Sequence, residues 1–212
     1  MRVIISILLL ILLFNSSKSF AYEPKAGNIT ATLGALTTRT IFDGSTSGAD
    51  TGYLGGFGLI AVGDVSGVGS LELSAFYTKK EFVRDRDAMF LVTRSQVAQV
   101  NMGYRWWLTS YLSASLTFYS AYSFGSPEIV HNDFPDGEGV TTSADDTTEY
   151  GFDISSQYEM WSSGRYAVVL DGRYSYSVTA KQNEYANSYA FLVGVRYFIQ
   201  EKAPKKTRTP NF

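Results

Sequence analysis

Few residues of this chain have the types and spacing that catalysis requires. His131 is the only histidine, and it stands in the run His131-Asn132-Asp133. A Ser-His-acid hydrolase would need this imidazole beside a nucleophilic hydroxyl. The neighbouring sequence offers no serine in a matching spacing, and the chain contains neither a Gly-rich phosphate loop nor a zinc-ligand cluster. We therefore predict no catalytic residue and a protein that is not an enzyme.

Acidic residues surround this histidine. The segment 125–147 contains no lysine or arginine, and its carboxylates are Glu128, Asp133, Asp136, Glu138, Asp145 and Asp146. Carboxylates grouped beside a glycine can hold a divalent cation. Phe134, however, occupies a position where the EF-hand pattern requires a ligand. We interpret the segment as a solvated surface loop and predict no metal site and no cofactor.

The elements that carry these residues are strands. In the stretch GYRWWLTSYLSASLTFYSAYSFG, residues 103–125, an apolar residue stands at nearly every second position, with small polar residues between. This period of two is typical of a strand with one apolar face. Similar patterns predict eight strands, at 28–42, 51–63, 69–80, 90–105, 110–124, 148–161, 165–180 and 187–200.

Connection length and strand length favour a membrane barrel. The segments 43–50, 81–89, 125–147 and 181–186 form a longer set, which alternates with tight connections at 64–68, 106–109 and 162–164. An up-and-down barrel shows this alternation when one rim faces the cell exterior and the other faces the periplasm. Most of the strands are also longer than the roughly 9–11 residues that cross a bilayer on a tilt. We predict an all-β fold, an eight-stranded antiparallel up-and-down transmembrane β-barrel.

Aromatic residues gather at the predicted strand ends. All three tryptophans, Trp106, Trp107 and Trp161, lie at tight-turn ends. Because amphipathic rings favour the headgroup zone of a bilayer, we predict that these three side chains belong to an aromatic girdle. Ordinary core aromatics would explain buried rings but not their sorting to the strand ends.

Charged residues separate from apolar ones along the later strands. In 165–180, Tyr166, Val168 and Leu170 alternate with Asp171 and Arg173 on the other face. A charged residue on the lipid face costs a few kcal/mol at mid-depth, so the charged face must point inward. The fourth strand fits poorly, because its apolar residues share a face with Arg94 and Gln96, and we expect a bulge there or a stretch above the membrane.

Over residues 28–200 the chain resembles the small eight-stranded outer-membrane β-barrel superfamily, the type of the OmpA transmembrane domain and OmpX. The most specific segment is Gly194-Val195-Arg196-Tyr197-Phe198-Ile199. It is similar to the closing strand that such proteins present to the barrel-assembly machinery, so the resemblance implies an assembly signal at Gly194, Tyr197 and Ile199. Members of the superfamily often end on an aromatic residue at that strand, whereas this chain continues as QEKAPKKTRTPNF.

An eight-stranded barrel has room inside for side chains and little else. We expect Glu72, Arg105, Glu159 and Arg196 near the periplasmic ends of their strands and Asp171 with Arg173 nearer the middle. We predict that these six residues pair across the lumen and close it. Partly hydrated charges without a network are the alternative.

The two ends of the chain suggest export. Arg2, an apolar run from Val3 to Phe14 and the sequence Ser19-Phe20-Ala21 predict a signal peptide at 1–21, followed by the barrel at 22–200. The remaining residues, 201–212, are basic, and we interpret them as a disordered periplasmic tail. With no cysteine, the chain can form neither a lipoprotein anchor nor a disulfide.

These observations predict a protein of the outer membrane of a Gram-negative bacterium. The expected partners are outer-membrane lipid, lipopolysaccharide and the barrel-assembly machinery, whereas an extracellular partner stays unknown. The net charge of −2 and the absence of a basic stripe argue against nucleic acid. Two functions remain open: a structural or surface-interaction barrel, and a narrow porin-like or hydrophobic-solute transport protein. A soluble lipid-binding barrel of the periplasm is a third possibility.

Overall fold

The computed structural model describes residues 22–42, 51–135, 139–146 and 148–200. The predicted signal peptide at 1–21 and the predicted tail at 201–212 lie outside these residues. The described residues contain no helix that is both long and apolar enough to cross a membrane.

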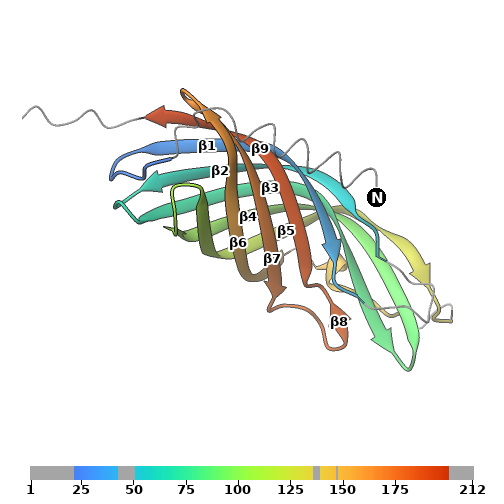
Figure 1. Ribbon diagram of the computed structural model, residues 1–212. Coiled ribbons are helices and arrows are strands. Elements are labelled where there is room, and N and C mark those ends of the chain that lie inside the picture. The colour runs from blue at the N-terminus through green and yellow to red at the C-terminus, as the bar shows by residue number, and fades with distance from the viewer. Residues whose placement is uncertain (1–21, 43–50, 136–138, 147, 201–212) are drawn as a thin grey trace, which may run out of the picture.

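Eight long antiparallel strands form a closed ring in the described part of the chain (Figure 1). Each strand pairs with its neighbour in sequence, and β9 pairs with β1 to close the ring. The eight-stranded up-and-down barrel predicted from the sequence is therefore confirmed. The strands are β1 (Ile29–Thr40), β2 (Leu54–Asp64), β3 (Gly69–Arg86), β4 (Met89–Trp107), β5 (Leu112–Asn132), β6 (Thr148–Ser163), β7 (Tyr166–Ser177) and β9 (Ser188–Gln200).

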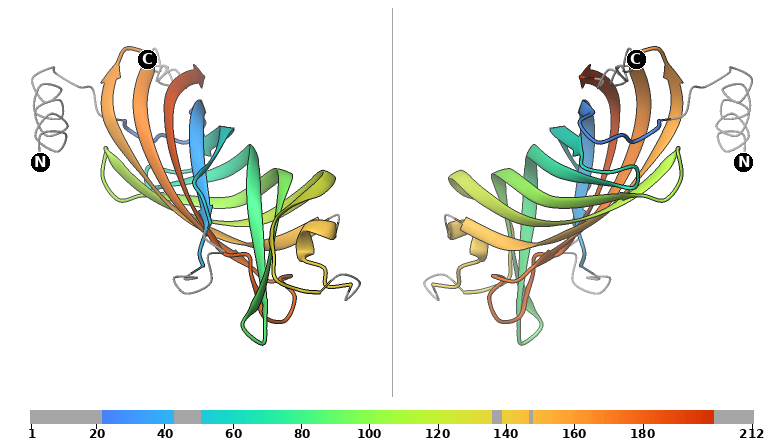
Figure 2. Two further views of the ribbon diagram at one scale, coloured as in Figure 1. Left: turned by 90° about the vertical axis from the view of Figure 1, so that its right-hand side faces the viewer. Right: turned by 90° about the vertical axis from the view of Figure 1, so that its left-hand side faces the viewer.

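The ring has a tight-turn end and a long-loop end. At the tight-turn end, short connections join β2 to β3, β4 to β5 and β6 to β7. At the other end, the connection between β5 and β6 contains the short 3-10 helix η1 (Ser143–Asp145), and the connection between β7 and β9 contains β8 (Glu184–Tyr185). Figure 2 shows the strands wrapped around one axis, with η1 at the long-loop end.

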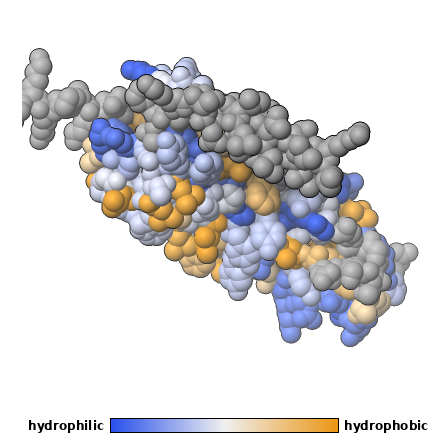
Figure 3. All heavy atoms as spheres, in the orientation of Figure 1, coloured by the Kyte–Doolittle hydropathy of each residue, from blue (hydrophilic) through white to orange (hydrophobic). Residues whose placement is uncertain are grey.

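The alternation of side chains places apolar groups on the outside of the barrel. In β9, Val193 and Val195 are 55% and 49% exposed, whereas Arg196 is 2% exposed. Strands β6 and β7 show the same sorting, and for β7 this confirms the inward and outward faces predicted from the sequence. Apolar residues lie on the visible wall between polar residues at the two ends (Figure 3). This wall has the chemistry of a surface in contact with acyl chains.

The connection 81–89 is shorter than its sequence suggests. We expected it among the long loops, but β3 and β4 pair continuously as far as Arg86 and Met89, and only Asp87 and Ala88 form the turn. Both turn residues have positive φ, 55° and 62°, as a type I′ hairpin turn requires. The strands continue because segments outside the hairpin cover its apolar residues: Phe82 packs on Ala144 and Ala186, and Val83, which pairs with Val92 of β4, packs on Phe42.

The irregularity expected in the fourth strand is present. The register between β4 and β5 shifts between Val92 and Thr93 and again between Arg94 and Gln96. Beyond the second shift, β5 continues to Asn132, so part of the predicted acidic loop is strand. The β3–β4 hairpin and the end of β5 consequently project past the other strands (Figure 1).

Candidate functional site

Charged side chains from four strands meet inside the barrel. The Arg105 guanidinium on β4 lies 2.6 Å from a Glu72 carboxylate oxygen on β3 and 3.4 Å from Asp171 on β7. Arg173, also on β7, donates to Glu72 at 2.8 Å and to Asp171 at 2.6 Å. Its Nη1 lies 3.4 Å from Asp153 of β6. We call these five residues the central network.

The central network is closed off from solvent. The side chains of Glu72, Arg105 and Asp171 have no exposed surface, and that of Arg173 is 3% exposed. Arg105 also donates to Ser113 at 2.7 Å and to Ser155 at 3.2 Å. Buried charges are tolerated when each is paired and hydrogen-bonded, and this condition is met here. The network is therefore a buried set of ion pairs inside the barrel.

The depth of these residues differs from the expectation. We placed Glu72 and Arg105 near one end and Asp171 with Arg173 nearer the middle, yet all four contact one another. Strands in a barrel are tilted and staggered, so equal distances along two strands do not correspond to equal depths.

Glu159 and Arg196 form a second site nearer the tight-turn end. The Arg196 guanidinium donates to the Glu159 carboxylate, and both side chains are at most 2% exposed. Arg196 Cζ also lies 4.6 Å from the Tyr22 ring centroid and 5.5 Å from that of Trp107. The six residues predicted to pair across the lumen are thus divided between the central network and this pair.

The prediction for Trp107 is wrong. This side chain turns into the barrel, where it is 8% exposed and its Nε1 donates to Ser70 Oγ at 2.8 Å. Consecutive residues of a strand face opposite sides, so Trp106 and Trp107 cannot both face lipid. Trp106 is the outward member, at 44% exposure, and Trp161 is half-buried on the outer wall beside Val168.

The closing strand lies in the ring as β9, between β7 and β1. Tyr197 and Ile199 face outward at 37% and 54% exposure, and Gly194 faces the lumen side. Gly194 is opposite Gly34 of β1, and a Cβ on Gly34 would lie 2.6 Å from the Val193 carbonyl oxygen. The role of these residues as an assembly signal stays a prediction.

Sequence reasoning missed a third buried charged site, an ion pair nearer the long-loop end. Lys80 Nζ lies 2.6 Å from Glu149 Oε1, and Tyr119 Oη donates to the same oxygen at 2.8 Å. Lys80 and Glu149 are 6% and 5% exposed. Both stand on the inward parity of predicted strands, so the alternation that identified Asp171 could have identified them.

At the long-loop end, the segment around η1 contacts β4 and the connection between β7 and β9. Glu184 accepts hydrogen bonds from Ser143 N at 2.7 Å, Ser143 Oγ at 2.5 Å and Lys181 N at 2.7 Å. Thr142 caps η1 and contacts Thr93 Oγ1 of β4 at 2.5 Å. These contacts hold η1 across the inner side of the projecting strands, and we call residues 141–145 the lid.

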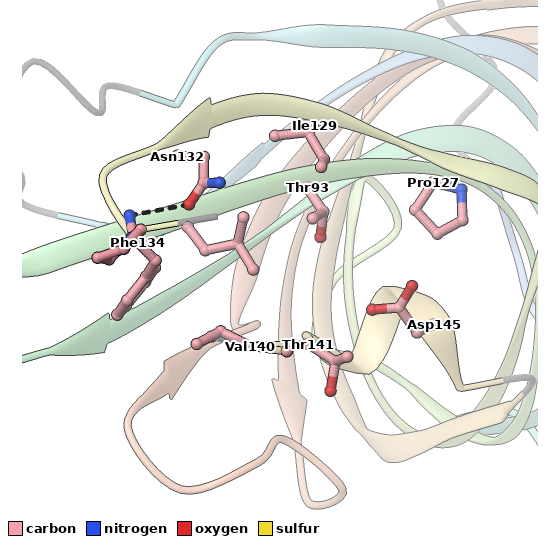
Figure 4. A pocket seen from close by; sticks show the side chains of 11 residues that line it. Thr93, Pro127, Ile129, Asn132, Phe134, Val140, Thr141 and Asp145 are labelled. Carbon is pink, nitrogen blue, oxygen red and sulfur yellow. Dashed lines mark hydrogen bonds between the residues drawn. The ribbon is translucent and has the colours of Figure 1, made fainter. Parts of the chain in front are cut away.

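A hollow of about 250 Å³ lies between the lid and β5 (Figure 4). Ile129 and Thr93 border it on one side, and Val140, Thr141 and Asp145 border it on the other. Ile129, on the projecting end of β5, borders the hollow and is 63% exposed.

His131 precedes Asn132, which lines this hollow, and it contacts an acid. Its Nε2 is 2.9 Å from Asp133 Oδ1, and Phe90 N donates to Asp133 Oδ2 at 3.1 Å. The contact with His131, followed by the hydrogen bond from Phe90 N, holds the pKa of the Asp133 carboxyl below its ordinary value. Among the described residues, no serine hydroxyl is hydrogen-bonded to this imidazole, so the structure does not assemble a hydrolase triad here.

Comparison with known proteins supports the fold. No protein-family model and no curated protein sequence matches the chain. Among solved structures, the outer membrane protein OprG from Pseudomonas aeruginosa superposes with a TM-score of 0.55 at 10% identity, over 84% of this chain and 99% of OprG. The attachment invasion locus protein Ail of Yersinia pestis, in complex with the heparin analogue sucrose octasulfate, gives 0.49 at 11% identity, over 82% and 99% of the two chains. The fold is that of the small eight-stranded outer-membrane β-barrels.

Proposed function

We propose that this protein resides in the outer membrane of a Gram-negative bacterium and has a structural or surface-interaction role. The apolar outer wall supports this location, since lipid is the solvent that such a wall requires. On this proposal the long-loop end faces the cell exterior and the tight-turn end faces the periplasm. Lipid and lipopolysaccharide are the partners of the wall.

The lumen of this barrel is closed. The observation that carries this proposal is the central network, in which Arg105 bridges Glu72 and Asp171 with no exposed side-chain surface. An open aqueous path would need water at this level, and the side chains of the central network are at most 3% exposed there. In a barrel without a channel, the outer wall and the loops are the surfaces that can bind other molecules.

Conductance in planar bilayers tests the closed lumen. We expect purified, folded protein to show no steady current above the bare bilayer. A large steady conductance, together with swelling of liposomes in small solutes, would overturn this proposal and support a narrow transport protein.

The projecting β3–β4 hairpin and β5 provide the interaction surface. They extend past the ladder between β2 and β3, which ends at Gly56 and Thr78. Binding of whole cells to host or bacterial surfaces, compared between the full protein and a variant with 81–87 shortened, tests this role. Equal binding by the two proteins would remove the hairpin from the proposal.

The processing and assembly of the chain belong to the same proposal. Residues 1–21 are the signal peptide, 201–212 are the periplasmic tail, and Gly194, Tyr197 and Ile199 are read by the barrel-assembly machinery. N-terminal sequencing of the exported protein, outer-membrane fractionation and heat-modifiable migration test these assignments. A mature chain that begins before Tyr22 would contradict the first of them.

A further inference from the structure

A short N-terminal segment, residues 22–28, lies across the tight-turn end of the barrel. It precedes β1 and is therefore not needed to close the ring. Tyr22 is nevertheless 2% exposed, as buried as the lumen charges. We propose that residues 22–28 are a plug that seals this mouth, with Tyr22 as its anchoring side chain. The inference rests on the proposed closed lumen, to which it adds a second closure.

Aromatic contacts hold the Tyr22 ring in place. Its centroid lies 4.3 Å from that of Trp107 and 5.1 Å from that of Phe198. Arg196 Cζ lies 4.6 Å from the same centroid. A cation over an aromatic face is attracted by the ring quadrupole, and the attraction is stronger in a desolvated site. Tyr22 therefore covers the Arg196–Glu159 pair from the tight-turn side.

Asp64 fixes the plug through hydrogen bonds. The Tyr22 hydroxyl donates to Asp64 Oδ2 at 2.6 Å, and Lys25 N donates to the same oxygen at 2.9 Å. Ser70 Oγ donates to the other oxygen, Oδ1, at 2.6 Å. Asp64 is 4% exposed, so its carboxylate depends on these donors for its stability in the barrel.

Backbone bonds extend the barrel into the plug. Gly27 N donates to Asp64 O at 2.8 Å, and Asp64 N donates to Asn28 O at 2.9 Å. Gly27 has a φ of 95°, which turns the chain from β1 back toward the barrel axis. The plug is thus built by specific contacts along its length.

Cysteine accessibility tests the plug directly, because the chain has no cysteine of its own. Ala167 is 0% exposed, faces the lumen and pairs with Arg196 across β7 and β9. Ala167→Cys is introduced, and a charged, membrane-impermeant thiol reagent is applied from either side of proteoliposomes that hold the barrel in one orientation. Heat-modifiable migration verifies that each variant is folded.

We expect slow labelling from both sides in the otherwise unchanged protein. Tyr22→Ala removes the ring and should accelerate labelling from the tight-turn side by at least about a hundredfold, the factor that corresponds to loss of a buried aromatic side chain. Tyr22→Phe keeps the ring and loses the hydrogen bond to Asp64, so it should accelerate labelling from the tight-turn side about tenfold. Tyr111→Ala, which removes a 37% exposed tyrosine from a turn at the same end, is the control and should leave the rate unchanged.

The outcomes separate the plug from the closed lumen. Fast labelling from the long-loop side in the unchanged protein would overturn the closed lumen. Slow labelling from that side, with no acceleration by Tyr22→Ala or Tyr22→Phe from the other, would overturn the plug alone. If Tyr22→Ala does not fold, Tyr22→Phe decides the same question.

Discussion

Arg173 Nη2 lies 2.8 Å from Glu72 Oε1 inside the barrel, although 101 residues separate the two along the chain. Glu72 also accepts from Arg105 Nε at 2.8 Å, so one carboxylate joins two guanidinium groups. Within the central network, this carboxylate is the bridge between β3, β4 and β7.

Removal of this bridge should destabilise the barrel. Glu72→Ala removes a carboxylate partner from the buried guanidinium groups of Arg105 and Arg173. Removal of one member of a buried ion pair lowers the free energy of unfolding by about 3–5 kcal/mol. The free energy of unfolding in urea, measured in lipid vesicles, checks this expectation. Glu128→Ala is the control, since its 67% exposed carboxylate lies 3.8 Å from Arg94 and should contribute less than about 1 kcal/mol. Equal losses in the two variants would contradict the role of Glu72.

The three tryptophans should differ in their contact with lipid. In variants that keep one tryptophan each, brominated acyl chains should quench the fluorescence of Trp106 and Trp161 strongly and that of Trp107 little, because Trp107 is 8% exposed and faces the lumen. Spectra in unbrominated lipid give the reference for each protein. Trp107 quenched as strongly as Trp106 would show that its side chain faces the bilayer.

Gly151 should not tolerate a side chain. A Cβ at this position would lie 2.1 Å from Tyr176 O and 2.5 Å from Tyr119 Cε1. Gly151→Val should therefore displace the Tyr119 ring from Glu149 and lower the folded fraction, measured by heat-modifiable migration after refolding. Gly63→Val is the matched control, since a Cβ there meets nothing within 4 Å. Wild-type folding of Gly151→Val would refute the close approach of β6 to Tyr119.

Glu184 should control the lid. Glu184→Ala removes the acceptor of two Ser143 bonds and one Lys181 bond, so residues 141–145 should become accessible to protease in the folded protein. Limited proteolysis with mass spectrometry measures the cleavage rate. Asp146→Asn, at a 53% exposed carboxylate near Lys181, should leave the rate almost unchanged. If protease cleaves the lid of Glu184→Ala no faster than that of the wild type, contacts other than those of Glu184 hold the lid in place.

The plug should weaken in alkali. Burial, reinforced by the hydrogen bond to Asp64, raises the pKa of the Tyr22 hydroxyl above its ordinary value. A group whose pKa is raised on folding contributes stability that is complete below the unfolded pKa, about 10, and is lost as the pH rises toward the folded value. The difference in unfolding free energy between wild type and Tyr22→Phe should therefore shrink from about pH 9 to about pH 11. A constant difference would contradict the buried hydroxyl.

The alternation of apolar and charged residues along the sequence is enough to predict the barrel and its two faces. Asp171 and Arg173 oppose Val168 and Leu170 within one segment, and a membrane wall permits only one assignment of those faces. The same alternation could have identified Lys80 and Glu149. It also separates Trp106 from Trp107, which clustering at strand ends alone does not.

Other features depend on contacts that a local pattern does not contain. The segment 81–89 is rich in charged residues and is typical of a loop, yet all of it except the turn at Asp87 and Ala88 is strand, because distant segments cover Phe82 and Val83. The joining of Glu72 with Arg173 depends on the stagger of the ring. Tyr22 stands before the first strand, and only the position of Asp64 and Trp107 in space shows what it binds.

The two-residue turn at Asp87 and Ala88 closes a hairpin whose two strands stay paired up to the turn. Eight residues of β3 follow Thr78, where the ladder with β2 ends, and at the rise of a strand they carry the tip roughly 25 Å farther. A guest epitope spliced at this tip would be held away from the lipid surface on a ladder of paired backbone. The barrel could thus serve as a display scaffold for peptides too short to reach past a bacterial coat by themselves.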